Sequence, residues 1–189
     1  MGGSVVPLLF LRVIRNIFMA ASIPDKRYFL NRLALEHECD PLSLDPYWVL
    51  QQLFNDIPLE EMQELFADFC EAAIAPAYIW KSKTPGALIR FGEEMEQLIE
   101  GSYLLLAWIR LQKGSPKKSD ERPPQIIRRF FKVNDLAGWK RWLHSWQTGA
   151  LSACSIAEIV EPEDLLPFVQ WMEKLVVAAA AMAKEGKKK

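Results

Sequence analysis

Apolar residues recur every three or four positions over most of the 189-residue chain, which is the spacing of one face of an α-helix. The clearest case is the segment 58–75, where the apolar positions are Leu59, Met62, Leu65, Phe66, Phe69 and Ala73. No segment alternates apolar and polar residues in the way a strand does, and no glycine is paired with asparagine or aspartate in a hairpin turn. The pattern therefore predicts an all-α protein.

Proline and aspartate mark where these helices begin, because proline suits the first helical position and aspartate caps the free N–H groups before it. The predicted helices are 24–38, 46–54, 58–75, 85–112, a short helix opening at Pro123, 136–152, and a long final helix from Pro162. Asp45 and Asp135 are the expected caps of two of them. The second half of 85–112 is apolar on nearly all sides, so we expect this helix at the centre of a bundle.

The same pattern occurs twice. Residues 46–107 align with 123–184 at an offset of 77 without a gap, with 11 identities in 62 positions, among them the pair Met95-Glu96 with Met172-Glu173. Composition alone would give about 4 identities. The matched hydrophobic pattern is the stronger sign, and it predicts a tandem duplication of a three-helix unit.

A unit of about 60 residues is marginal as an independent domain. We therefore expect the two units to pack on one another, related by a pseudo-two-fold axis, in a helical bundle with additional N-terminal helices; a two-unit solenoid is the alternative. The expected organisation is a single all-α domain over 23–189, with repeat 1 at 46–112, a polar linker at 113–122 and repeat 2 at 123–185.

Residues 1–22 differ in composition from the rest of the chain. The first 24 residues contain no acid and are strongly apolar, with Arg12 and Arg15 inside the apolar run. Two arginines there disfavour a transmembrane span, and the lack of a positive charge before the run disfavours a signal peptide. The segment is either an apolar amphipathic helix that docks or lies on a membrane surface, or a non-native extension if Met19 is the true start.

Net charge and cysteine content limit the function classes. A formal net charge of −1 gives no overall attraction to nucleic acid or to an anionic membrane. Cys39, Cys70 and Cys154 are an odd number with no CxxC spacing, which favours reduced, buried thiols in a cytoplasmic protein. Trp139, Trp142 and Trp146 share one helical face, but their counterparts in the first repeat are Met62, Leu65 and Phe69. Such a set fills a core rather than stacking bases.

The two repeats differ most in charge. The first carries an acidic helix face and the second a cluster of basic residues, and together these make the candidate partner-binding residues: Glu60, Glu64, Asp68, Glu71, Arg128, Arg129, Lys132, Lys140 and Arg141. The two sets could pair within the chain, for example Glu64 with Arg141, or could bind a second copy head to tail. The basic set alone could bind a phosphate backbone, or all of these charges could simply be solvated.

The sequence contains no recognisable catalytic or metal-binding motif. It has no glycine-rich phosphate loop and no nucleophile elbow, and its two histidines lack metal-ligand spacing. We therefore expect no enzyme activity, no metal and no cofactor. The leading hypothesis is a helical interaction module that binds a protein partner or a second copy, and the alternative is a nucleic-acid-associated accessory protein that uses the basic residues.

Overall fold

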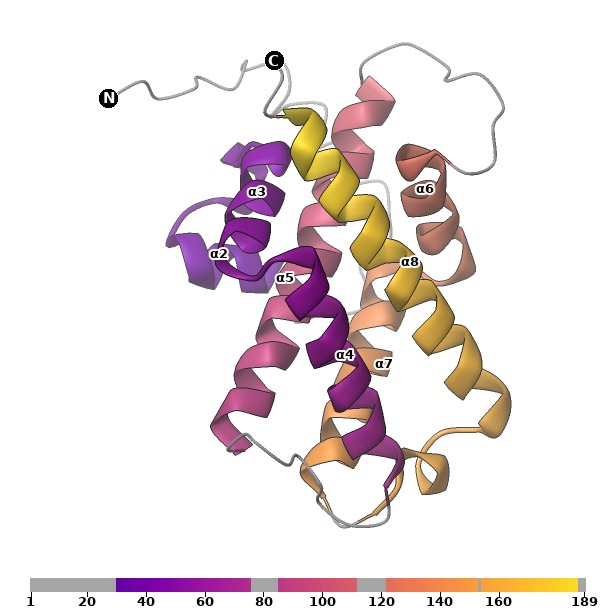
Figure 1. The fold of residues 1–189 in the computed structure, drawn as a ribbon. Coiled ribbons are helices and arrows are strands. Elements are labelled where there is room, and N and C mark those ends of the chain that lie inside the picture. The colour runs from indigo at the N-terminus through magenta and orange to yellow at the C-terminus, as the bar shows by residue number, and fades with distance from the viewer. Residues whose placement is uncertain (1–29, 76–84, 112–121, 153, 187–189) are drawn as a thin grey trace.

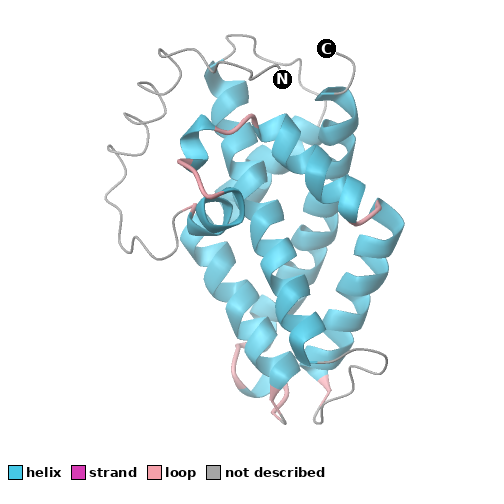
Figure 2. Ribbon diagram, turned by 90° about the vertical axis from the view of Figure 1, so that its left-hand side faces the viewer, coloured by secondary structure: helices cyan, strands magenta, loops and turns pink. Residues whose placement is uncertain are grey.

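The computed structural model describes residues 30–75, 85–111, 122–152 and 154–186. Every regular element in these ranges is helical, so the all-α prediction is confirmed (Figure 2). The α-helices are α2 (Asn31–His37), α3 (Pro46–Asp56), α4 (Leu59–Ile74), α5 (Pro85–Leu111), α6 (Pro123–Val133), α7 (Leu136–Leu151) and α8 (Pro162–Gly186). Two short 3₁₀ turns, η2 (Pro41–Ser43) and η3 (Ile156–Glu158), lie between them.

The helices begin at the residues that the sequence marks. The Asp45 carboxylate accepts a hydrogen bond from the Tyr47 N–H at 2.9 Å, just before α3. The Asp135 carboxylate accepts from the Gly138 N–H at 2.6 Å and caps α7. Each cap provides a partner for an N–H group that has none within the helix. Both predicted caps are confirmed.

The two halves of the chain interlock. Helix α4 packs against α7 and α8, while α5 packs against α3, α6 and α7. Helix α8 also contacts both α3 and α6, and it runs diagonally between them in Figure 1. Helices of the first half therefore pack against helices of the second half on several sides.

Helix boundaries follow the offset found in the sequence. Helices α3 and α6 begin and end at positions 77 residues apart, and so do α4 and α7; α5 and α8 begin 77 residues apart. The contacts of α5 with α7 have a counterpart in those of α4 with α8. The duplication and its pseudo-two-fold axis stay predictions, which a superposition of 46–107 on 123–184 would test.

Buried aromatic and aliphatic side chains form the core. Trp139 and Trp146 are buried and Trp142 is half-buried, so the prediction that they fill the core is confirmed. The Trp146 ring stacks on Phe168 at a centroid distance of 4.7 Å. The Trp139 indole N–H donates to the Phe130 carbonyl at 2.9 Å, so its polar atom is also satisfied.

The long helices supply the centre of the bundle. From Gln97 to Ala107, all residues of α5 except Tyr103 are buried, as the apolar sequence predicts. In α8, Glu163–Gly186 is long and apolar enough to cross a membrane by length and composition. Its buried residues, including Phe168, Met172 and Leu175, belong to the same core.

The cysteines correct one expectation. Cys70 is buried, but Cys39 and Cys154 are exposed, so the prediction of three buried thiols is wrong for those two. Cys39 lies between α2 and η2, and Cys154 lies between α7 and η3. Burial raises the pKa of the Cys70 thiol, and the nearby Glu173 carboxylate adds to that rise. The expectations for residues 1–22 and for the linker 113–121 lie outside the described residues.

Candidate partner-binding surfaces

The acidic residues of α4 lie on its exposed side. Glu60, Glu64, Asp68 and Glu71 are all exposed and recur every three or four positions. The opposite side of α4 is buried in the core through Met62, Phe66 and Phe69. The helical period thus separates the carboxylates from the core and gathers them on one solvent-facing side.

The basic residues of the second half are more scattered. Arg129 and Lys132 on α6 and Arg141 on α7 are exposed, and Arg128 is half-buried. Lys140 is 0% exposed. The prediction that Lys140 belongs to a basic surface is therefore wrong, because its position on α7 points into the bundle and not out of it.

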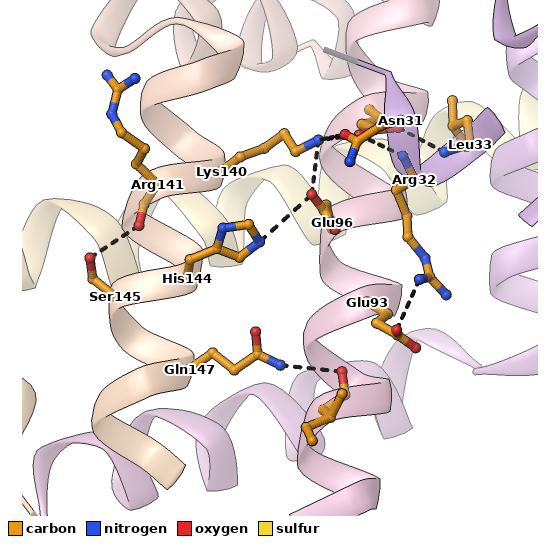
Figure 3. A network of polar contacts seen from close by, with 12 residues as sticks. Asn31, Arg32, Leu33, Glu93, Glu96, Lys140, Arg141, His144, Ser145 and Gln147 are labelled. Atoms are coloured by element: carbon orange, nitrogen blue, oxygen red, sulfur yellow. Dashed lines mark hydrogen bonds and ion pairs between the residues drawn. The ribbon is translucent and has the colours of Figure 1, made fainter. Parts of the chain in front are cut away.

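Lys140 instead forms the centre of a buried ionic network between α7 and α5 (Figure 3). Its ammonium group lies 2.8 Å from a Glu96 carboxylate oxygen and also pairs with Glu100. It donates a further hydrogen bond to the side chain of Asn31, at the start of α2. His144, one turn along α7, points toward Glu96 at 3.7 Å, whereas Arg141 points away from the network.

Glu100 joins this network to α2. Its two carboxylate oxygens accept hydrogen bonds from the backbone N–H groups of Arg32 at 3.1 Å and Leu33 at 2.8 Å. A carboxylate at that place is favourable because the first N–H groups of a helix lack partners within it. Burial raises the pKa of Glu100, and the opposing influences are the Lys140 ammonium and the two N–H donors. Through these bonds Glu100 fixes α2 against α5.

A charged cleft of about 380 Å³ lies beside this contact of α2 with α5. It is bordered by α2, the end of α3 and the start of α5. Arg32 lines it and pairs with Glu93 at 2.9 Å and with Glu36 at 3.1 Å. Burial raises the pKa of Glu94, also in the lining, and its bond to Arg90 opposes that rise. Arg90 pairs with Glu94 at 3.2 Å, so both arginines of the cleft form ion pairs with acids of its lining.

A larger groove lies between α4, α6 and α8. It has a volume of about 470 Å³ and is lined by Gln63, Phe66, Ile126, Glu173, Lys174, Val176 and Val177. Val177 is 45% exposed, so an apolar side chain of α8 is presented to solvent there. The groove is mainly apolar, with one acid and one base among its lining residues.

The structure brings the predicted residues together only in part. The acidic set shares one helix face, whereas the basic set is divided between α6, α7 and the interior. Sequence reasoning did not find the Lys140 network, although the helical period contained a signal. Leu136, Trp139, Lys140 and Leu143 follow the i, i+3, i+4, i+7 spacing of one buried face.

The described residues contain no group of three or more His, Cys, Asp and Glu side chains that could hold a metal ion. No protein-family model, no curated protein and no solved structure matches this chain. The assignment of a function therefore depends on the surfaces described above.

Proposed function

We propose that this protein is a non-enzymatic helical interaction module that binds a protein partner, in the first instance a second copy of itself, through its oppositely charged surfaces. The observation that carries the proposal is the exposure of four acidic residues on one side of α4, while Arg129, Lys132 and Arg141 are exposed on α6 and α7. Complementary surface charge favours encounter and fixes the register of an interface.

A cytoplasmic location is part of the same proposal. All three cysteines are free thiols, two of them exposed, which is typical of a reducing compartment.

Charge reversal tests self-association. Reversing Glu64 and Asp68 to arginine should weaken the association by about tenfold or more, since like charges would then face each other. Reversal of Arg129 and Arg141 to glutamate should do the same. An equimolar mixture of the two variants should associate again, because one then carries two basic surfaces and the other two acidic surfaces. Sedimentation velocity at low salt measures all four samples.

Glu158→Arg is the matched control, because it makes the same charge change at an exposed residue outside the acidic face. The control should associate as the unchanged protein does, and the association should weaken as salt screens the charges. A monomer at all concentrations would remove the self-association version. Capture of another protein that depends on Glu64 would then place the partner outside this chain.

The alternative, a nucleic-acid-associated protein, is less well supported because Lys140 is buried and Arg128 is half-buried. Only three of the five candidate basic residues remain fully on the surface. Binding of a labelled oligonucleotide at ~50 mM salt, with an affinity that falls steeply as salt rises, would favour this alternative. Absence of binding under those conditions would exclude it.

A further inference from the structure

By the 77-residue offset, the apolar groove corresponds to the place that α2 covers in the other half of the chain. At the 77-residue offset, Gln63 corresponds to Lys140, Glu173 to Glu96 and Val177 to Glu100. The second member of each pair belongs to the buried network under α2. The groove lining comes from α4, α6 and α8, and no other described helix contributes to it.

The side chains that line the groove differ in chemistry from those that contact α2. Val177 stands where Glu100 accepts hydrogen bonds from the N-terminus of α2, and the uncharged Gln63 stands where Lys140 forms its ion pairs. The groove therefore favours a more apolar occupant than α2. Its lining holds one acid, Glu173, and one base, Lys174, whose ammonium lies 5.0 Å from the Trp171 ring centroid.

Further acids lie on α4 beside the groove. Glu60 is one turn before Gln63 and Glu64 follows it directly, and both are exposed. An occupant that is apolar on one side and basic on the other would thus satisfy both the groove and its edge.

One segment of this chain has that composition. Residues 5–18 read VVPLLFLRVIRNIF, with no acid, and on a helix Arg12 and Arg15 would share one polar stripe. We propose that residues 5–18 bind in the groove of the same chain as a helix, with Arg12 and Arg15 directed toward Glu173 and Glu60, so that Glu64 and Asp68 stay exposed to a second copy.

The chain is long enough for this. Eleven residues, 19–29, separate the segment from Leu30, and an extended chain of that length reaches about 36–40 Å. Helix α2 packs on α5, α5 on α3, and α3 on α8, which borders the groove. Three interaxial distances of 8–10 Å amount to roughly 30 Å across the bundle. The extended connection is longer than this lateral separation.

Trypsin tests the proposal in the full-length protein, because it cleaves after Arg12 and Arg15. Val177→Arg places a bulky cation in the groove, and it should accelerate cleavage at both sites by about tenfold or more, since cleavage follows the undocked population. Amide hydrogen exchange of peptides that cover 5–18 should rise in parallel. Mass spectrometry measures both quantities.

Leu166→Arg is the matched control, since Leu166 is an exposed apolar residue on the same helix that does not line the groove. The control should leave cleavage and exchange unchanged, and thermal unfolding verifies that both variants are folded. Equal cleavage rates in the unchanged protein and Val177→Arg would overturn the proposal. Protection that grows with protein concentration would also overturn it, because the groove would then bind the segment of a second copy.

Discussion

At the residue scale, the feature with the highest desolvation cost is a fully buried lysine that pairs with one fully buried and one partly exposed glutamate. Lys140 pairs with Glu96 and Glu100, and Glu100 in turn accepts two backbone hydrogen bonds from α2. Removing an ion from water costs several kcal/mol, so such a group is tolerable only with close partners. The network therefore holds α2 in place, and loss of one partner should lower the stability of the fold.

Replacement of Lys140 by methionine should destabilise the protein by about 3–5 kcal/mol, because the buried carboxylates would lose their counter-ion. Urea unfolding followed by circular dichroism measures the change. Arg141→Met is the matched control, since Arg141 is the neighbouring residue and is exposed; its effect should stay within about 0.5 kcal/mol. Similar stability of the two variants would contradict the structural importance of the network.

The network also shows where sequence reasoning failed. Charge alone placed Lys140 with the exposed arginines, whereas the helical register places it between Trp139 and Leu143 on the buried side. Lysines are rarely buried. This general preference predicts an exposed Lys140, although its position in the helical spacing indicates a buried one. The partners that make this burial possible, Glu96 and Glu100, come from a helix 40 residues earlier in the chain, and no local pattern joins them to Lys140.

At the element scale, close approach between helices depends on small residues. A methyl group at Gly101 in α5 would lie 3.1 Å from the Val49 side chain and 3.2 Å from the Leu50 side chain, both on α3. The counterpart of Gly101 in α8 is Ala178, also small and buried. Small side chains at these places let α5 and α8 pack closely against their neighbours.

Gly101→Leu should destabilise the protein by about 1–3 kcal/mol, because overpacking outweighs the gain in helix propensity. Ala67→Leu on the exposed side of α4 is the control, with an effect within about 0.5 kcal/mol. Thermal and urea unfolding compare the two. An unchanged stability for Gly101→Leu would mean that α3 and α5 are less closely packed than described.

Element positions were the part of the fold that the sequence predicted best. Pro46, Pro85 and the caps Asp45 and Asp135 fix helix starts by local chemistry, and those starts are observed. The prediction for 24–38 agrees over 31–37, where Leu33 is buried together with the preceding Leu30. The groove beside α8 could not be predicted, because it depends on which helices meet there and which position stays uncovered.

At the scale of the whole molecule, the main feature is that the helices of the two halves pack between one another. Each half supplies helices that bury the core residues of the other half, through the contacts of α4 with α7 and α8 and of α5 with α7. A half of the chain taken alone would therefore expose a large part of its apolar surface. We therefore expect neither half to be stable as an independent domain.

Separate fragments 1–117 and 118–189 should each lack a cooperative unfolding transition, and an equimolar mixture should recover one. Circular dichroism during heating measures the transition, and the intact chain provides the reference. Cooperative unfolding of either fragment by itself would show that its half is an independent domain, and the interlocked description would then need revision.

Because the interlocked helices belong to one chain, dilution should not separate them. A bundle assembled from two separate three-helix chains would dissociate as its concentration fell, since its folded state would depend on a bimolecular step. Joining both sets of helices in one chain replaces that step with an intramolecular one, at an effective concentration in the millimolar range for a short connection. The folded state of this protein should therefore not depend on its concentration.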